Sequence, residues 1–378
     1  MQGLYGSRGI TLSGGHGAIV EDVNGNAYID FYCGSGAALF GHCHPYLVKA
    51  LKEASEKPWT IGIGMGSEAR SRFIEALRDI FPGMDCFFCN SGSEAIEAAL
   101  KLVTFLNSKR KKIFALRRSF HGRTLGALSI TFNPQYRNPW THVLLPVIHA
   151  EPNELQSMID DDTVAVFVEP VRGEGGVYPL DESLGKGIVE ACKRHGALIV
   201  SDEVQCGWGR CGDYSVSSKR GLDPDIICFA KGVAGGLPVG MMLWKEELGG
   251  FPPSGHSSTY GGSPLVMSVA LAALRLLQNE DYMAKAVKFG EFFRALLKKT
   301  NSPLVREVRG MGFMNGVELT VKSAPIVKQL QDMGLLALPA GPFVVRFLSP
   351  FVAEKEHFER AADMFDEVLK RNEHGYGK

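Results

Sequence analysis

Two charged side chains stand at the ends of apolar runs. Burying a charged group there costs free energy unless a partner or a chemical role compensates for it. Lys231 closes DIICFAK (225–231), and Asp202 follows the apolar residues of ALIVSDEV (197–204). Moving an unpaired ammonium or carboxylate group from water into an apolar interior costs several kcal/mol of free energy. A lysine held this way is suited to act as a nucleophile or base, although it can also extend its stem to water. Asp202 needs either a cationic partner or backbone N–H groups to cap.

The segment NSGSEA (90–95) has the features of an anion cradle at the start of a helix. Ser91 and Glu94 have capping-box spacing, in which each side chain satisfies a free N–H of the first helical turn. Gly92 leaves backbone N–H groups accessible at the positive end of the helix, and Ser93 adds a hydroxyl. This combination suits a phosphate, but many helices begin in the same way without a ligand.

Two further loops carry side chains that recognise planar rings and carboxylates. In SFHGR (119–123), Phe120 could lie against a flat ring, and Arg123 could grip a carboxylate with two hydrogen bonds. In EPVRGEGGV (169–177), Glu169 and Glu174 bracket a glycine-rich turn. For both loops the alternative is a surface turn, with a packed phenylalanine in one and solvated carboxylates in the other.

An alternation of strands and helices places these groups along one edge of a sheet. Continuous apolar runs predict buried strands, and the segments between them predict helices. The expected strands are 85–90, 111–118, 163–170, 197–204 and 225–231, and the expected helices are 93–106 and 182–196. This order predicts an α/β fold with a mostly parallel sheet covered on both faces. Ligands of such sheets bind outside the carboxyl ends of the strands.

The flanking regions have a different pattern. Before the alternation, a β-hairpin is expected around NGN (24–26), with helices at 45–57 and 67–80. After residue 262 come two long helices, shorter strands and a closing helix at 353–372. We therefore expect a large α/β domain at 49–261 and a smaller α+β domain formed by 1–48 and 262–378.

One ligand uses all four kinds of group at this sheet edge. Pyridoxal 5'-phosphate (PLP) has an aldehyde for an amine, a ring nitrogen for a carboxylate, a phosphate for a helix start and a flat face for an aromatic ring. The residues therefore favour PLP as the cofactor. Lys231 would then be held as a Schiff base rather than as a free buried ammonium group.

The composition excludes several classes of protein. The 378 residues contain 41 Lys+Arg and 41 Asp+Glu, so no net charge favours nucleic acid or an anionic membrane. No apolar run reaches the length of a membrane span, and the first residues lack the pattern of a secretion signal. We expect a cytoplasmic enzyme or binding protein.

The eight cysteines do not have the spacing of a secreted disulfide framework. CFFC (86–89) and GHCHP (41–45) offer possible metal ligands, but the second half of a ligand set is not visible. We expect buried free thiols and no metal.

The motifs taken together resemble the class III aminotransferases of PLP fold type I. They follow the order of that family from about residue 9 to residue 350: NSGSEAIEAALK, SFHGRT, EPVRGEGGV, IVSDEVQCGWGR, AKGVAGGLPVG, SSTYGGSPL and VREVRGMGF. The chain looks most similar to the acetylornithine aminotransferase branch. ITFNPQYRNPW, VREVRG and AGPFVVRFLSP resemble the archaeal members that act on lysine or ornithine attached to a small acidic amino-group carrier protein.

The resemblance implies a role for each cofactor-site residue. Lys231 would bind the PLP aldehyde and move the proton, and Asp202 would keep the ring nitrogen protonated. The remaining cofactor contacts would be Gly92 and Ser93 at the phosphate, Phe120 over the ring, Val204 beneath it, Gln205 near its phenolic oxygen, and Glu203 in the same DEVQ segment. Thr259 would reach the phosphate of a second subunit, which implies a homodimer with shared active sites.

The resemblance also implies two carboxylate sites for two unlike substrates. Arg123, with Ser258 nearby, would bind the α-carboxylate of the amino donor. Arg346 would bind the α-carboxylate of glutamate or 2-oxoglutarate, and Glu174 would mask Arg346 while the terminal amine is bound. The implied reaction transfers the terminal amino group of an N-blocked ornithine or lysine to 2-oxoglutarate, as in arginine or lysine biosynthesis.

Several positions depart from the family pattern. Ser263 replaces the usual Asn and so lacks the hydrogen bonds of an amide. Trp208 and Arg172 replace the usual Phe and Gln, which leaves the substrate preference open. Arg117, Arg118 and Arg137 add positive charge that suits either an acidic carrier or ordinary solvation. A free-ornithine or 4-aminobutyrate transaminase is the alternative within the fold, and a PLP-binding regulatory protein without turnover is the alternative outside catalysis.

Overall fold

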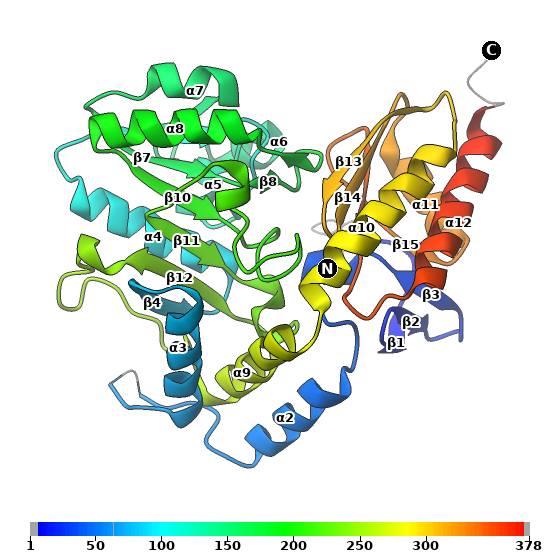
Figure 1. The fold of residues 1–378 in the computed structure, drawn as a ribbon, viewed down its shortest axis with the longest axis horizontal. Helices are drawn as coiled ribbons and strands as arrows, with labels where there is room; N and C mark the ends of the chain where they lie inside the picture. Colours follow the sequence, from blue (N-terminus) through cyan, green and yellow to red (C-terminus); the bar gives the residue numbers. More distant parts are fainter. Residues whose placement is uncertain (1–6, 63, 374–378) are drawn as a thin grey trace.

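A seven-stranded sheet forms the centre of the molecule in the computed structural model, which describes residues 7–62 and 64–373 (Figure 1). Its order is β4-β12-β11-β10-β7-β5-β6, and every pairing is parallel except the two made by β12. The strands are β4 (Met84–Cys89), β5 (Lys112–Leu116), β6 (Val147–Ala150), β7 (Thr163–Val168), β10 (Leu198–Asp202), β11 (Ile226–Phe229) and β12 (Gly240–Lys245). The predicted mostly parallel sheet is confirmed, while β6 and β12 were not predicted.

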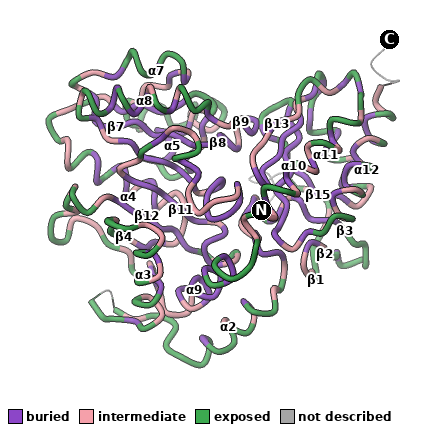
Figure 2. Tube along the Cα trace, in the orientation of Figure 1, coloured by how far each residue is buried: buried purple, intermediate pink, exposed green. Residues whose placement is uncertain are grey.

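Helices cover both faces of this sheet, because successive side chains of each strand point to opposite sides. In β5, Ile113 and Ala115 join one apolar cluster, whereas Phe114 and Leu116 join another. The first cluster includes α4 (Gly92–Leu106) and α5 (Leu125–Ile130), and the second includes α7 (Pro152–Met158) and α8 (Glu182–His195). Figure 2 shows the strands between them as buried.

A second, antiparallel sheet lies beside the first in Figure 1 and has the order β13-β14-β17-β16. Its strands are β13 (Val305–Met311), β14 (Met314–Leu319), β16 (Leu338–Pro339) and β17 (Val344–Leu348), packed with α10 (Tyr282–Lys299), α11 (Ser323–Asp332) and α12 (Lys355–Glu373). The N-terminal strands β1 (Leu12–His16), β2 (Ile19–Asp22) and β3 (Ala27–Asp30) pair in series, and β3 pairs with β15 (Leu335–Leu336). This pairing places residues 29–30 beside residues 335–336, although they are far apart in the sequence. The boundaries of the smaller domain at 48/49 and 261/262 stay a prediction.

Helix α9 (Pro264–Asn279) packs against both α2 (Pro45–Ser55) and α3 (Glu68–Ile80), and α3 lies beside β4 in Figure 1. α2 and α9 each begin with proline, whose missing N–H costs nothing at the first helical position. The shorter elements are α1 (Cys33–Gly36), α6 (Pro134–Arg137), β8 (Val171–Arg172), β9 (Tyr178–Pro179) and the 3-10 turns η1 (Asn138–Trp140), η2 (Ser218–Arg220), η3 (Lys231–Ala234) and η4 (Glu246–Leu248). Within the described residues, no helix combines the length and apolar character needed to cross a membrane.

Candidate active site

A cavity of about 310 Å³ opens at the carboxyl ends of the parallel strands, where the sequence predicts the site. This volume lies within the range of small-molecule sites. Predicted site residues from five separate segments line it: Gly92, Ser93, Phe120, Glu174, Asp202, Val204, Gln205 and Lys231. The grouping arises because each of β4, β5, β7, β10 and β11 delivers its following loop to the same edge of the sheet.

The start of α4 forms one wall of this cavity. The Ser91 hydroxyl accepts the Glu94 N–H at 3.2 Å, while the Glu94 carboxylate accepts the backbone N–H of Asn90 at 3.1 Å. The predicted capping box is therefore present, with the return bond displaced by one residue. At Gly92 a Cβ atom would lie only 2.7 Å from a methyl carbon of Val204, so a side chain there would fill the approach to the helix N-terminus.

Lys231 lies just beyond β11, which ends two residues earlier than predicted, at Phe229. It opens η3 with φ of +34°, a left-handed backbone conformation that costs a non-glycine residue about 1–3 kcal/mol. Its side chain is half-buried in the cavity. Burial lowers the pKa of its amine, opposed by the charges of Glu174 and Asp202. A strained, desolvated lysine of this kind is favoured where a neutral amine must react.

The carboxylate of Asp202 has a partner that the sequence reasoning missed. His121 Nδ1 donates to Asp202 Oδ2 at 2.7 Å, and the His121 side chain is fully buried. The other oxygen, Oδ1, accepts the backbone N–H of Val204 at 3.0 Å. Asp202 is therefore held by an imidazole and a backbone N–H rather than by an arginine or lysine. The signal was present in SFHGR, where the histidine directly follows Phe120.

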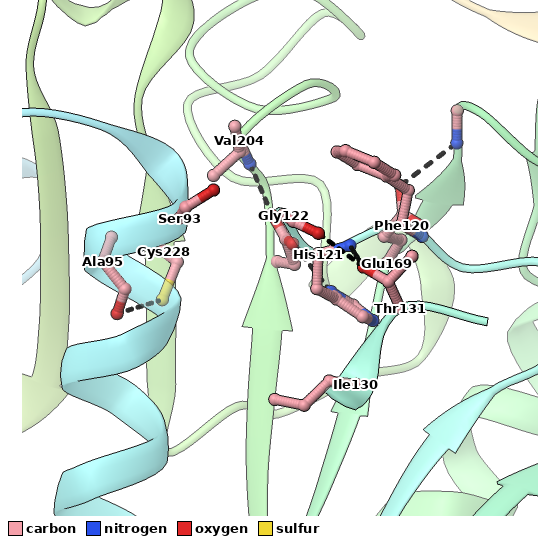
Figure 3. Close-up of polar contacts among 12 residues, drawn as sticks. Ser93, Ala95, Phe120, His121, Gly122, Ile130, Thr131, Glu169, Val204 and Cys228 are labelled. Atoms are coloured by element: carbon pink, nitrogen blue, oxygen red, sulfur yellow. Dashed lines mark hydrogen bonds and ion pairs between the residues drawn. The ribbon is translucent and has the colours of Figure 1, made fainter. Parts of the chain in front are cut away.

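Glu169 fixes the backbone of two loops that border the cavity (Figure 3). One carboxylate oxygen accepts the N–H of Phe120 at 2.7 Å, and the other accepts the N–H of Gly173 at 3.1 Å. Burial raises the pKa of Glu169 to about 7, although the charge of His121 and these two hydrogen bonds favour the ionised form. The segment carrying Phe120 and the turn carrying Glu174 are thereby joined through one buried side chain.

The predicted pair between Arg346 and Glu174 is present. Arg346 Nη2 lies 2.5 Å from Glu174 Oε1, and Nη1 donates to Gln205 Oε1 at 2.8 Å. Arg346 is buried, whereas one-third of the Glu174 side chain is exposed. Burial raises the pKa of Glu174, but the charge and hydrogen bond of Arg346, together with the charges of Lys231 and Arg123, lower it more, so the pKa lies below its usual range. An arginine held by a half-exposed glutamate can be released when that glutamate turns away.

The remaining predicted substrate and phosphate contacts lie outside the cavity lining. Arg123 is exposed, and its backbone N–H donates to Ser93 Oγ at 3.4 Å. The Ser258 hydroxyl accepts from the side chain of Asn90 at 3.2 Å, which places it beside the start of α4. Thr259 is exposed to solvent. Their roles stay predictions.

Glu203 does not line the cavity, so its expected cofactor contact stays a prediction. Its buried carboxylate binds the hydroxyl groups of Ser215 and Ser217 and the N–H of Val216, none of which lines the cavity. Neighbouring residues of an extended segment face opposite ways, so Asp202 and Glu203 cannot both point into one site.

Two departures from the family pattern also lie away from the cavity. Trp208 is buried among the rings of Phe73, Tyr214 and Phe229. Arg172 is buried and donates to the carbonyl of Arg117 at 3.1 Å. Both therefore act on packing rather than by touching a ligand in this cavity.

All eight cysteines are free thiols, and most are buried, as expected, although Cys43 is exposed. Among the described residues, no three His, Cys, Asp or Glu side chains are grouped closely enough to hold a metal ion.

Comparisons with known proteins agree with this geometry. A family model described as aminotransferase class-III matches residues 6–369. A putative [LysW]-aminoadipate semialdehyde/glutamate semialdehyde transaminase from Pyrobaculum aerophilum is 39% identical over 98% of each chain. An acetylornithine aminotransferase from Methanosarcina mazei is 36% identical, covering 96% of this chain and 93% of that protein.

A solved ornithine aminotransferase from Toxoplasma gondii superposes with a TM-score of 0.92 at 27% identity, covering 99% of this chain and 93% of that one. A Bacillus anthracis aminotransferase superposes with a TM-score of 0.90 at 25% identity, covering 96% and 93%. The predicted fold, an α/β PLP-dependent transferase of fold type I, is confirmed by these likenesses.

Proposed function

The chain belongs to the class-III aminotransferases, and from that premise we propose that it moves the terminal amino group of an N-blocked ornithine or lysine to 2-oxoglutarate. The products are the corresponding semialdehyde and glutamate. The observation that carries this proposal is the Arg346–Glu174 pair beside Lys231, since it provides a carboxylate site that can be masked. The printed activities of the relatives support the same substrate class.

The residues of the cavity fit PLP. Gly92 and Ser93 at the start of α4 would hold its phosphate, Phe120 and Val204 its two ring faces, and Asp202 its ring nitrogen. The close approach of Val204 to Gly92 supports the assignment, because only a residue without Cβ leaves the helix N-terminus accessible. When bound, PLP supplies a carbonyl for amino groups and a ring that withdraws electrons.

The protein side chains then have separate tasks. Lys231 Nζ holds and moves the proton, and its lowered pKa keeps more of the amine neutral at a given pH. Gln205 stays on Arg346 when Glu174 leaves, so the guanidinium remains in place. Glu174 cancels the charge of Arg346 while the chain of a terminal amine lies nearby, and it withdraws when a carboxylate arrives. One site can thereby accept two unlike substrates in turn.

We expect Glu174→Ala to favour glutamate over the terminal amine. The variant leaves Arg346 with Gln205 as its remaining side-chain partner, so the guanidinium attracts carboxylates at all times. The ratio of kcat/KM for glutamate to kcat/KM for N-acetylornithine should rise about tenfold or more, which corresponds to about 1.4 kcal/mol. Single-turnover kinetics of each half-reaction measures this ratio.

Glu182→Ala is a suitable control, because Glu182 forms an exposed helical pair with Lys186 away from the cavity. Its half-reaction ratio should equal that of the wild type. Parallel changes in both half-reactions of Glu174→Ala would contradict the masking role.

Substrate identity is tested by half-reactions with N-acetylornithine, N-acetyllysine, free ornithine and a carrier-linked lysine. The absorbance of bound PLP should change with glutamate and with at least one blocked donor. A protein that responds to free ornithine alone would overturn the N-blocked assignment. A protein whose absorbance is unchanged by glutamate and by every amine would overturn transamination.

The relatives named for LysW suggest an amino-group carrier as the blocking group. Arg118 is exposed near the site, but Arg117 lies 3.5 Å from Glu151, which offsets part of its charge. The half-reaction with carrier-linked lysine therefore tests whether the protein accepts a donor bound to a carrier.

We include a homodimer in the proposal, with Thr259 reaching the phosphate site of the second copy. Thr259 is exposed, and the side chains of Trp59, Met65 and Tyr260 are 60–64% exposed, which is unusual for large apolar groups. A cavity of about 460 Å³ also lies between α2, α3 and α9. Light scattering that gives a monomer mass for the active enzyme would contradict this arrangement.

A further inference from the structure

An aromatic ring from outside the cavity supports the arginine at its rim. The guanidinium carbon of Arg123 lies 3.2 Å from the centroid of the Tyr136 ring and 6.0 Å from that of Phe120. The Tyr136 and Phe120 rings meet edge to face, with centroids 6.2 Å apart and an angle of 86°. Phe120 lines the cavity, so Tyr136 contacts both the arginine and the ring-covering aromatic residue.

The geometry points to Tyr136 as a specificity-determining positioning residue for the amino donor. A guanidinium stacked on an aromatic ring uses its face, while its N–H donors lie in the plane and stay available. Arg123 can therefore rest on Tyr136 and still present two parallel N–H groups to a carboxylate. This inference rests on the proposed function, because it assumes a donor that carries an α-carboxylate.

The position of Tyr136 suits this task. It lies in the short helix α6, whose first turn is capped by Asn133, with the Asn133 side chain accepting the N–H of Gln135 at 3.0 Å. The Tyr136 side chain is half-buried, whereas Arg123 is exposed and would otherwise sample many rotamers. Holding one rotamer in advance reduces the entropy lost when the carboxylate binds.

The charge of the stacked Arg123 influences a group inside the cavity, the carboxylate of Glu174. This charge contributes to keeping the pKa of Glu174 below the usual range, after burial and the larger effect of Arg346 are counted. The backbone N–H of Arg123 also contacts Ser93 at the start of α4. Tyr136 therefore orients an arginine whose backbone contacts the start of α4 and whose charge acts on the masking glutamate.

The test compares two donors that differ by one carboxylate, namely N-acetylornithine and N-acetylputrescine. In the holoenzyme, Tyr136→Leu should lower kcat/KM for N-acetylornithine about tenfold and leave N-acetylputrescine unchanged. Tyr136→Phe should retain wild-type values for both donors, because the ring alone provides the stacking. The dissociation constant of the unreactive probe N-acetylnorvaline, measured by calorimetry, should rise about tenfold in Tyr136→Leu and stay constant in Tyr136→Phe.

A double-mutant cycle with Arg123→Gln separates positioning from packing. If Tyr136 acts through Arg123, then Tyr136→Leu has no further effect on N-acetylornithine in the Arg123→Gln protein. Independent, multiplying effects would overturn the inference, and so would equal losses for both donors in Tyr136→Leu or no loss for either. Wild-type enzyme that does not prefer N-acetylornithine over N-acetylputrescine would instead overturn the α-carboxylate assignment on which the inference depends.

Discussion

Lys231→Ala is expected to lower the turnover of every amino donor by about a thousandfold or more. Lys231 supplies the amine from the loop after β11, and no other lysine lines the cavity within the described residues. Its backbone is held at φ of +34° and its pKa is lowered by burial, so both the position and the protonation of Nζ suit proton transfer. Alanine leaves the proton without an acceptor at that place. The loss is measured in two assays, as the steady-state kcat with glutamate and as the turnover of N-acetylornithine in the presence of 2-oxoglutarate.

A matched control removes a lysine that has no place in the cavity. Lys186 is exposed on α8 and pairs with Glu182, so Lys186→Ala should keep wild-type kcat. The Lys231→Ala protein should still bind PLP without a covalent bond, which the cofactor content after gel filtration reports. Partial recovery of turnover on adding a small primary amine would show that the missing amine, and not a misfolded cavity, causes the loss. Full activity of Lys231→Ala would refute its role.

The site at the carboxyl ends of the strands could be predicted because the sequence signals that locate it lie in single short segments. Each apolar run that ends in a polar residue marks the carboxyl end of a strand, and parallel order brings these ends together. Lys231, Asp202 and the start of α4 were located in this way and line one cavity. The strand β12 was missed because GMMLWK follows a glycine-rich segment and lacks a preceding helix, so nothing nearby in the sequence indicates its antiparallel insertion between β4 and β11.

Contacts between distant segments were harder to predict from the residues alone. His121 and Asp202 are 81 positions apart, and Gln205 and Arg346 are 141 apart, so only the folded chain reveals that they bond. The resemblance predicted the Arg346–Glu174 pair, but it did not predict the second support from Gln205. Tyr136 likewise gives no sign in the sequence that its ring supports Arg123.

The place of Glu203 outside the cavity lining has a simple physical reason that the sequence already contained. Once Asp202 is assigned to the cavity, the alternation of an extended chain directs Glu203 away from it. The buried carboxylate is then satisfied by hydroxyl and backbone donors of residues 215–217, although burial still raises its pKa. A buried acid beside a site is therefore a candidate ligand only when its place in the strand alternation agrees.

Asp202→Asn is expected to lower kcat by about a hundredfold to a thousandfold while the fold is kept. Asparagine has nearly the same shape, and its oxygen can still accept the Val204 N–H that Asp202 Oδ1 accepts at 3.0 Å. What it removes is the negative charge that, under the proposed function, would keep a proton on the ring nitrogen of bound PLP. The amide also cannot accept from His121 through its nitrogen, so the 2.7 Å bond must be lost or reversed. The rate of each half-reaction in single-turnover experiments measures the effect.

Asp225 provides the matched control for this loss of charge. It lies at the opposite end of the same two strands, where its carboxylate accepts the Ile199 N–H at 2.8 Å and lies 3.2 Å from Lys245. Asp225→Asn removes an equal charge from the amino edge of the sheet, so it should reduce stability slightly and leave kcat unchanged. Because the two variants differ mainly in which edge of the sheet loses its charge, equal rates in both would show that the carboxylate of Asp202 has no special part in turnover.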